Sequence, residues 1–205
     1  MILLRGKRSL NTKQKTINMR IEKFTPLAII LLVLFTSCYR ESSNTLLQQK
    51  VTSQTNMLQL LQKIDSLGDL GVYNAAIAMD YIAYAENFGS AYPEEQMAPE
   101  FLYKAGLMAM TVAKLSENKE EREFYSQKAL SIFDGILKVY PDYGNIKNCM
   151  LNKGVVYDDI LHDYENAEIH YKEFIARYPT DSLAINIEAY LHFLGKTPEE
   201  ILAKK

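Results

Sequence analysis

The feature that most constrains the fold is a residue spacing that occurs three times and ends each time in Tyr-Pro. The same steps of four, three and five residues separate Tyr81, Ala85, Phe88 and Pro93; Ala129, Phe133, Ile136 and Pro141; and Ala167, Tyr171, Phe174 and Pro179. Steps of four and three place side chains on one side of an α-helix. Proline then ends the helix, because it lacks an N–H and disfavours helix in the residue before it. The pattern predicts three amphipathic helices.

Two glycines extend the repeat in the other direction. Gly106 follows Pro93 by 13 residues, and Gly154 follows Pro141 by the same number. A glycine at a repeated helical position indicates that two helices approach too closely for a β-carbon. We therefore predict helical hairpins: residues 46–67 with 72–88, 101–115 with 124–139, and 145–161 with 163–177. Pro99, tolerated only in the first turn of a helix, places the start of the second hairpin near Ala98.

This hairpin pattern resembles the tetratricopeptide repeat, in which Gly, Tyr, Ala, an aromatic residue and Pro stand at set offsets. The family positions are filled by Gly154, Tyr157, Ala167, Tyr171 and Pro179 in one repeat and by Gly106, Ala129, Phe133 and Pro141 in the repeat before it. The resemblance implies an all-α helical-hairpin solenoid of about three repeats. A last short helix, with Thr197 as N-cap and Pro198 at its first position, is expected to cap the stack.

The sequence departs from the family spacing in two places. Gly154 and Ala167 are 13 residues apart where the family has 12, and Gly106 and Ala129 are 23 apart. The longer spacing contains the charged run 115–123, which cannot be core. We expect that run to lengthen the hairpin tip into solvent.

The N-terminus reads as a targeting segment. Residues 26–35 form an apolar run of about ten residues after Lys and Arg, which is the length of a signal-peptide core and short for a membrane span. Small residues directly before Cys38 resemble the bacterial lipobox, in which the cysteine carries the lipid. We expect a signal peptide at 1–37, a tether at 38–44 and a solenoid domain at 45–205. Translation from Met19 would give a signal peptide of ordinary length, and in that case residues 1–18 come from a wrongly assigned start codon. An uncleaved membrane anchor is the alternative.

With Cys38 lipidated, Cys149 is the one remaining cysteine and cannot form an intramolecular disulfide. It lies beside Met150 and Leu151 on a predicted helix. We expect a buried and inert thiol, because no neighbouring residue in the sequence is arranged to lower its pKa.

Composition and motifs argue against several classes of function. A net charge of −2 gives no basic stripe for nucleic acid. The chain has no phosphate-binding glycine loop, no zinc-binding His-Glu-x-x-His, no Cys-x-x-Cys and no nucleophile elbow. His162, His170 and His192 fit neither one helix face nor a metal pair. We expect no catalytic residues, no metal site and no cofactor, and read the pair Asp158-Asp159 as a solvated helix face.

The resemblance also implies a partner groove lined by the first helix of each repeat. Its residues map to Tyr103, Leu107, Met110, Asn148, Leu151, Val155 and Asp158. The basic clamp that some members use for a C-terminal carboxylate is absent, so an amphipathic helix or extended peptide is the expected occupant. The alternative, strongest for Leu107 and Leu151, is burial against the neighbouring helix.

The Tyr-Pro turns, residues 98–106 and the closing 194–201 are similar to small tetratricopeptide lipoproteins of the Gram-negative envelope. The resemblance implies a non-enzymatic, lipid-anchored adaptor on the periplasmic face of the outer membrane, holding a protein partner in β-barrel assembly or cell-wall coordination. The alternative is a binder of a small envelope ligand, such as a glycan or peptidoglycan fragment. A closed pocket with convergent polar groups would favour the ligand binder, and an open groove with an exposed apolar stripe would favour the adaptor.

Overall fold

The computed structural model describes residues 44–69 and 73–202. The predicted signal peptide at 1–37, the predicted lipidation site Cys38 and tether residues 39–43 lie outside this range. The chain divides into two compact units, Met1–Thr52 and Ser53–Lys205. In the first unit the described residues, 44–52, are helical.

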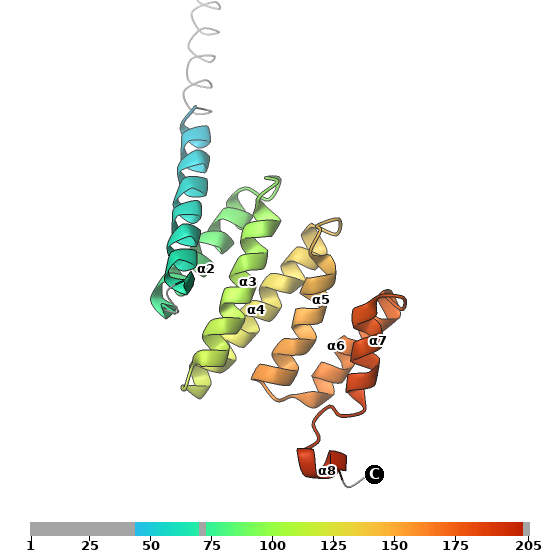
Figure 1. The fold of residues 1–205 in the computed structure, drawn as a ribbon. Coiled ribbons are helices and arrows are strands. Elements are labelled where there is room, and N and C mark those ends of the chain that lie inside the picture. The colour runs from blue at the N-terminus through green and yellow to red at the C-terminus, as the bar shows by residue number, and fades with distance from the viewer. Residues whose placement is uncertain (1–43, 70–72, 203–205) are drawn as a thin grey trace, which may run out of the picture. The chain divides into compact units, whose positions relative to one another are not determined.

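The described residues form helices and no strand (Figure 1). After the helical residues 44–69 come α2 (Ala75–Ala91), α3 (Ala98–Leu115), α4 (Lys119–Val139), α5 (Ile146–Val155), the π-helix η1 (Val156–Ile160), α6 (Tyr164–Arg177), α7 (Ser182–Leu191) and α8 (Pro198–Leu202). The predicted all-α class is therefore confirmed.

Consecutive helices pack against one another from α2 to α7, and η1 also contacts α3, α4 and α6. In Figure 1, α3 and α5 lie in front of α4 and α6. The core consists of two clusters of buried apolar side chains. The N-terminal cluster includes Phe88, Phe101 and Phe133, and the C-terminal cluster includes Tyr171 and Phe174.

The three Tyr-Pro pairs end their helices in the same way. Tyr92, Tyr140 and Tyr178 each donate the backbone N–H to the carbonyl four residues earlier, at 2.8, 2.8 and 2.9 Å. The carbonyl of each tyrosine then accepts the N–H three residues later, at 3.1, 3.0 and 3.0 Å. The predicted helix ends at residues 139 and 177 are confirmed, whereas the helix predicted to end at residue 88 continues to Ala91. One turn geometry follows each of the three ends.

The two repeated glycines lie against aromatic rings. A β-carbon on Gly106 would lie 2.5 Å from Cε1 of Phe133, and one on Gly154 would lie 2.5 Å from Cδ1 of Tyr171. Both distances are shorter than an ordinary van der Waals contact between two carbon atoms. The predicted close approach of paired helices is therefore confirmed at both positions.

The start of α4 differs from the prediction. The sequence predicted a helix from residue 124, but α4 begins at Lys119, because Asn118 Oδ1 accepts the N–H groups of Glu120 and Glu121 at 2.8 and 3.2 Å. The charged run is mostly exposed, as expected, yet most of it is helix. Ser116 and the two residues after it form the connection to α3, so the extra residues lengthen the helices rather than a loop.

The C-terminal helix starts as predicted. Thr197 Oγ1 accepts the N–H of Glu200 at 3.3 Å, and a carboxylate oxygen of Glu200 accepts the N–H of Thr197 at 2.8 Å. This reciprocal pair is a capping box, which satisfies two backbone donors at the start of a helix. The segment before it turns through Gly195, whose φ of 71° favours glycine.

Candidate binding groove and pocket

The predicted groove residues lie on α3, α5 and η1, and each is half-buried. α3 carries Tyr103, Leu107 and Met110, α5 carries Asn148, Leu151 and Val155, and η1 carries Asp158. Polar contacts hold α3 and the α5–η1 segment together at both ends. Tyr143, just before α5, donates its hydroxyl to Glu100 at 2.6 Å, and Lys114 pairs with Asp159 at 2.5 Å. The first helices of the two predicted repeats therefore run in the same direction.

At the first end of this predicted groove, the polar groups form hydrogen bonds within the protein. The ring of Tyr103 lies 6.3 Å from that of Phe133 and 6.1 Å from that of Tyr143. The hydroxyl of Tyr143 also accepts from Asn145 at 2.9 Å, and Asn148 donates to Oδ1 of Asn145 at 3.0 Å. Burial, together with the hydrogen bond to Glu100, raises the pKa of Tyr143.

The middle of the groove is apolar but not an exposed stripe. Leu107 and Met110 pack against the N-terminal cluster, whereas Leu151 and Val155 pack against the C-terminal cluster. None of the four is among the exposed large apolar side chains of the described residues. Each side chain therefore contributes to the core, as the burial alternative for Leu107 and Leu151 predicted, and still offers part of its surface to solvent. The partner groove stays a prediction.

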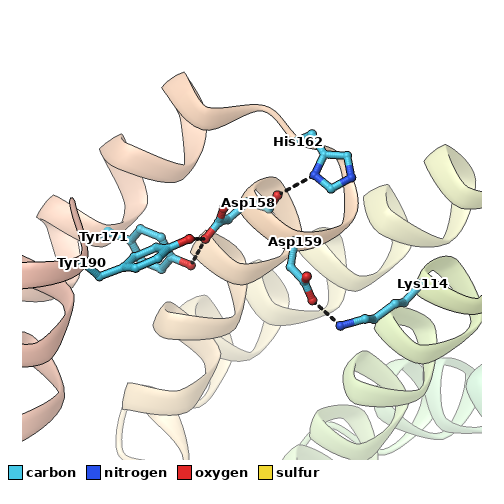
Figure 2. A network of polar contacts seen from close by, with 6 residues as sticks. All are labelled: Lys114, Asp158, Asp159, His162, Tyr171 and Tyr190. Carbon is cyan, nitrogen blue, oxygen red and sulfur yellow. Dashed lines mark hydrogen bonds and ion pairs between the residues drawn. The ribbon is translucent and has the colours of Figure 1, made fainter. Parts of the chain in front are cut away.

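At the other end, Asp158 joins three elements. Its Oδ2 accepts the hydroxyl of Tyr171 on α6 at 3.0 Å and the hydroxyl of Tyr190 on α7 at 2.8 Å. Figure 2 shows the two tyrosines reaching Asp158 from one side, while Lys114 reaches Asp159 from the other. The expectation of a solvated acidic pair is wrong for Asp158, which is a half-buried acceptor between helices. Asp159 is exposed, as expected, and pairs with Lys114.

The two tyrosines remain donors over the neutral pH range. Burial raises the pKa of Tyr190 to about 12, and the hydrogen bond to Asp158 acts in the same direction. Burial and the nearby charge of Asp158 also raise the pKa of Tyr171. Both hydroxyls are therefore protonated at neutral pH, and they fix the orientation of the Asp158 carboxylate.

The backbone around Asp158 is irregular. η1 is a π-helix, a conformation that accommodates an extra residue within an α-helix and is frequent at functional sites. Two residues after the end of η1, His162 has a φ of 54°, which is uncommon for a residue other than glycine. Nδ1 of His162 lies 3.1 Å from the carbonyl oxygen of Asp158. In this segment the Asp158 side chain contacts α6 and α7, and the Asp159 side chain contacts α3.

A pocket of about 420 Å³ opens beside this network. One wall is η1 with Asp158 and Asp159, a second contains Tyr164, Tyr190 and Phe193, and the third is the segment 195–201. Close packing holds that third wall in place, because a β-carbon on Gly195 would lie 2.8 Å from Cδ2 of Tyr164. Asp158 was predicted from the sequence as a groove residue, but the pocket was not predicted. The one sign of this irregular region in the sequence was the additional residue between Gly154 and Ala167, an interval that contains η1.

Two further observations bear on the class of site. Among the described residues, no group of three or more His, Cys, Asp and Glu side chains is placed to hold a metal ion. In that same part of the chain, no helix combines the length and apolarity needed to cross a membrane.

Comparisons with family models, curated proteins and solved structures each found no match to this chain.

Proposed function

We propose that this chain is a non-enzymatic adaptor of the tetratricopeptide type, anchored through a lipid on Cys38 and holding a protein partner at the periplasmic face of the outer membrane. The repeat type is supported by the equal contacts of Gly106 with Phe133 and of Gly154 with Tyr171. It is also supported by the same hydrogen-bonded turn after each Tyr-Pro pair. Equivalent contacts at equivalent positions are expected of stacked repeats.

The extra residue in the last full repeat agrees with this proposal. The family spacing is exceeded by one residue between Gly154 and Ala167, and η1 lies within that interval. A π-turn absorbs one residue without breaking the helix. The inserted residue therefore leaves the contact between Gly154 and Tyr171 in place.

The observation that carries the adaptor function is the arrangement of α3 beside the α5–η1 segment. Polar contacts hold these helices at both ends, and between the contacts they carry half-exposed Leu107, Met110, Leu151 and Val155. A rigid pair of helices with partly exposed apolar side chains suits an amphipathic helix or an extended peptide. The envelope location rests on the residues before and around Cys38.

Site-specific crosslinking in intact cells tests the adaptor function. A photoreactive amino acid replaces Met110 in the groove or, as the matched control, the exposed Ser131 on α4. We expect position 110 to form a discrete adduct with an outer-membrane or cell-wall component. Leu107→Arg should abolish that adduct while the far-UV circular dichroism stays native.

The anchor is tested in the same cells. Cys38→Ala should move the protein out of the membrane fraction and weaken the adduct. The same adducts from positions 110 and 131, or no adduct from position 110 in the anchored protein, would contradict the adaptor proposal. An unchanged membrane fraction in Cys38→Ala would contradict the lipid anchor alone.

The pocket beside η1 favours a second function, that of a binder of a small envelope ligand such as a glycan or peptidoglycan fragment. Its volume of about 420 Å³ falls within the usual range of small-molecule sites. Carboxylate, hydroxyl and aromatic groups converge on it. A ligand that protects the pocket residues, with no adduct from position 110, would place this function ahead of the adaptor.

A further inference from the structure

The pocket beside η1 combines a fixed carboxylate with exposed aromatic surface. Tyr164, Tyr190 and Phe193 line it, with exposed fractions of 42%, 42% and 48%. Aromatic rings attract cations through the negative charge of their faces, and they also cover the apolar part of an organic cation. Three such side chains around one pocket are therefore suited to a group that is both charged and partly apolar.

No ion pair with Lys, Arg or His among the described residues neutralises the carboxylate of Asp158 in this pocket. Its two hydrogen-bond donors, Tyr171 and Tyr190, are neutral hydroxyls that orient the group without cancelling its charge. The adjacent Asp159 differs, because Lys114 neutralises it. A negative charge in a fixed orientation is thus available at the pocket wall.

The pocket also contains a cation, Lys196, on its C-terminal wall. The ammonium of Lys196 donates to the backbone carbonyl of His192 and forms no ion pair with Asp158. It repels a cationic ligand but would attract an anionic one. Lys196 therefore gives an experimental means of telling the two ligand classes apart.

We propose that this pocket binds an organic cation, a primary ammonium or a guanidinium, with its charge at Asp158 and its apolar part against Tyr164, Tyr190 and Phe193. A charged donor gains a charge-assisted hydrogen bond from the carboxylate and a second attraction from the rings. An anion would be repelled by the negative charge of Asp158, which no ion pair among the described residues neutralises. A neutral group would gain neither electrostatic contribution. The chemistry is shared by a free amine and by a Lys or Arg side chain of a protein partner.

Calorimetric titration of the full chain in detergent tests the ligand class. The probes are n-butylammonium and n-butylguanidinium, and n-butanol is the neutral comparator. We expect the cations to bind about tenfold more tightly than n-butanol, and Asp158→Asn to remove most of that preference, because the charge it deletes is the attracting one. The control is Asp142→Asn, an exposed acid in the turn before α5, at the opposite end of that helix from η1.

Two further variants guard against a loss of fold in Asp158→Asn. Phe193→Ala, at an exposed position, should weaken cation binding. Lys196→Met should strengthen it, because the variant removes a repelling charge. The proposal is overturned if n-butanol binds as tightly as the cations, if Lys196→Met weakens cation binding, or if Phe193→Ala leaves it unchanged.

The source of the cation is decided by a second titration, which rests on the proposed adaptor function. The probes are acetyl-Gly-Arg-Gly-amide and its citrulline counterpart, which has the same shape without the charge. Tighter binding of the arginine peptide than of n-butylguanidinium assigns the site to a side chain of a protein partner. Equal binding assigns it to a free organic cation. Cation binding at the pocket can be observed even when position 110 forms no adduct. Failure of the pocket proposal is therefore distinguishable from failure of the adaptor proposal.

Discussion

At the scale of single residues, the packing of the helical pairs depends on a glycine placed against a ring. A β-carbon on Gly106 or Gly154 would meet the ring of Phe133 or Tyr171. Gly135 on α4 has no atom within 4 Å of its missing β-carbon. The same residue type therefore has opposite roles at different positions of the fold.

Gly106→Ala is predicted to destabilise the protein by roughly 1–3 kcal/mol, because the added methyl overlaps the ring of Phe133 inside a packed core. Gly135→Ala is the matched control. It should stabilise the protein by about 0.5–1 kcal/mol, because alanine loses less backbone entropy in a helix than glycine. Urea unfolding followed by circular dichroism measures both. Equal effects of the two substitutions would mean that the contact with Phe133 is unimportant.

Cys149 gives a second prediction at this scale. The side chain is buried, as the sequence predicted, and burial raises the pKa of its thiol to about 12. At pH 8 the reactive thiolate is therefore almost absent. In a Cys38→Ala background, where Cys149 is the single cysteine, iodoacetamide should react only after unfolding in urea. Modification of the native protein at the rate of a free thiol would show that the helices around Cys149 open.

At the scale of elements, helix ends were predictable where one residue sets them. Pro99 and the Tyr-Pro pairs determine a helix start or end through the backbone, and Thr197 determines a helix start through its side-chain hydroxyl. The structure agrees at each of these positions. The start of α4 was missed because Asn118 competes with other polar residues in a charged run, and its capping role is visible only in the folded turn. η1 was missed for a related reason, because a one-residue insertion does not reveal whether a loop or a helix absorbs it.

The start of α7 depends on one carboxylate with two roles. Asp181 accepts the N–H of Leu183 at 2.9 Å and pairs with Lys147 at 2.5 Å, which connects α7 to α5. The hydrogen bond from Lys147 lowers the pKa of Asp181, and the N–H of Leu183 adds to this effect. The same contact raises the pKa of Lys147. Both shifts mean that the folded state favours the charged form of each group.

Asp181→Asn separates these roles, because asparagine also caps a helix but carries no charge. A carboxyl whose pKa is lower in the folded state contributes stability above its unfolded pKa of 3.8, and that stability is lost as the pH falls through the lower folded value. The variant should therefore be less stable than the wild type at pH 7, and the difference should shrink as the pH falls below 3.8. Urea unfolding at several pH values measures it. A constant difference would assign the effect to the cap.

At the scale of the whole molecule, the sequence predicted the class of the fold but not the pocket. Repeated spacings are local, so the helices and the contacts of Gly106 and Gly154 follow from them. The pocket depends on contacts between distant residues: Asp158 and Tyr190 are 32 residues apart. The predicted groove residues are an intermediate case. The sequence placed them on helices, as the structure does, but their packing against two clusters depends on tertiary structure.

Three tyrosines whose pKa is raised in the folded state make the whole fold sensitive to alkali. Burial raises the pKa of Tyr81, of Tyr171 and, to about 12, of Tyr190 above the usual value of 10.0. In the unfolded chain these hydroxyls ionise near pH 10, so above that pH the folded state holds more protons than the unfolded state. Stability should therefore be constant below pH 10 with respect to these groups and should fall as the pH rises toward 12.

Tyrosine absorbance at 295 nm reports this ionisation directly, because lysines do not contribute to it. We expect part of the phenolate signal to appear only when circular dichroism shows loss of helix. Tyr190→Phe should lower the stability at pH 8, because the hydroxyl bond to Asp158 is lost, and should reduce the slope of stability against pH above pH 10. If all tyrosines ionise near pH 10 while the helices remain intact, then the hydroxyls of Tyr81, Tyr171 and Tyr190 are not protected in the native state. In that case the fixed orientation of Asp158, on which the pocket depends, would not persist in solution.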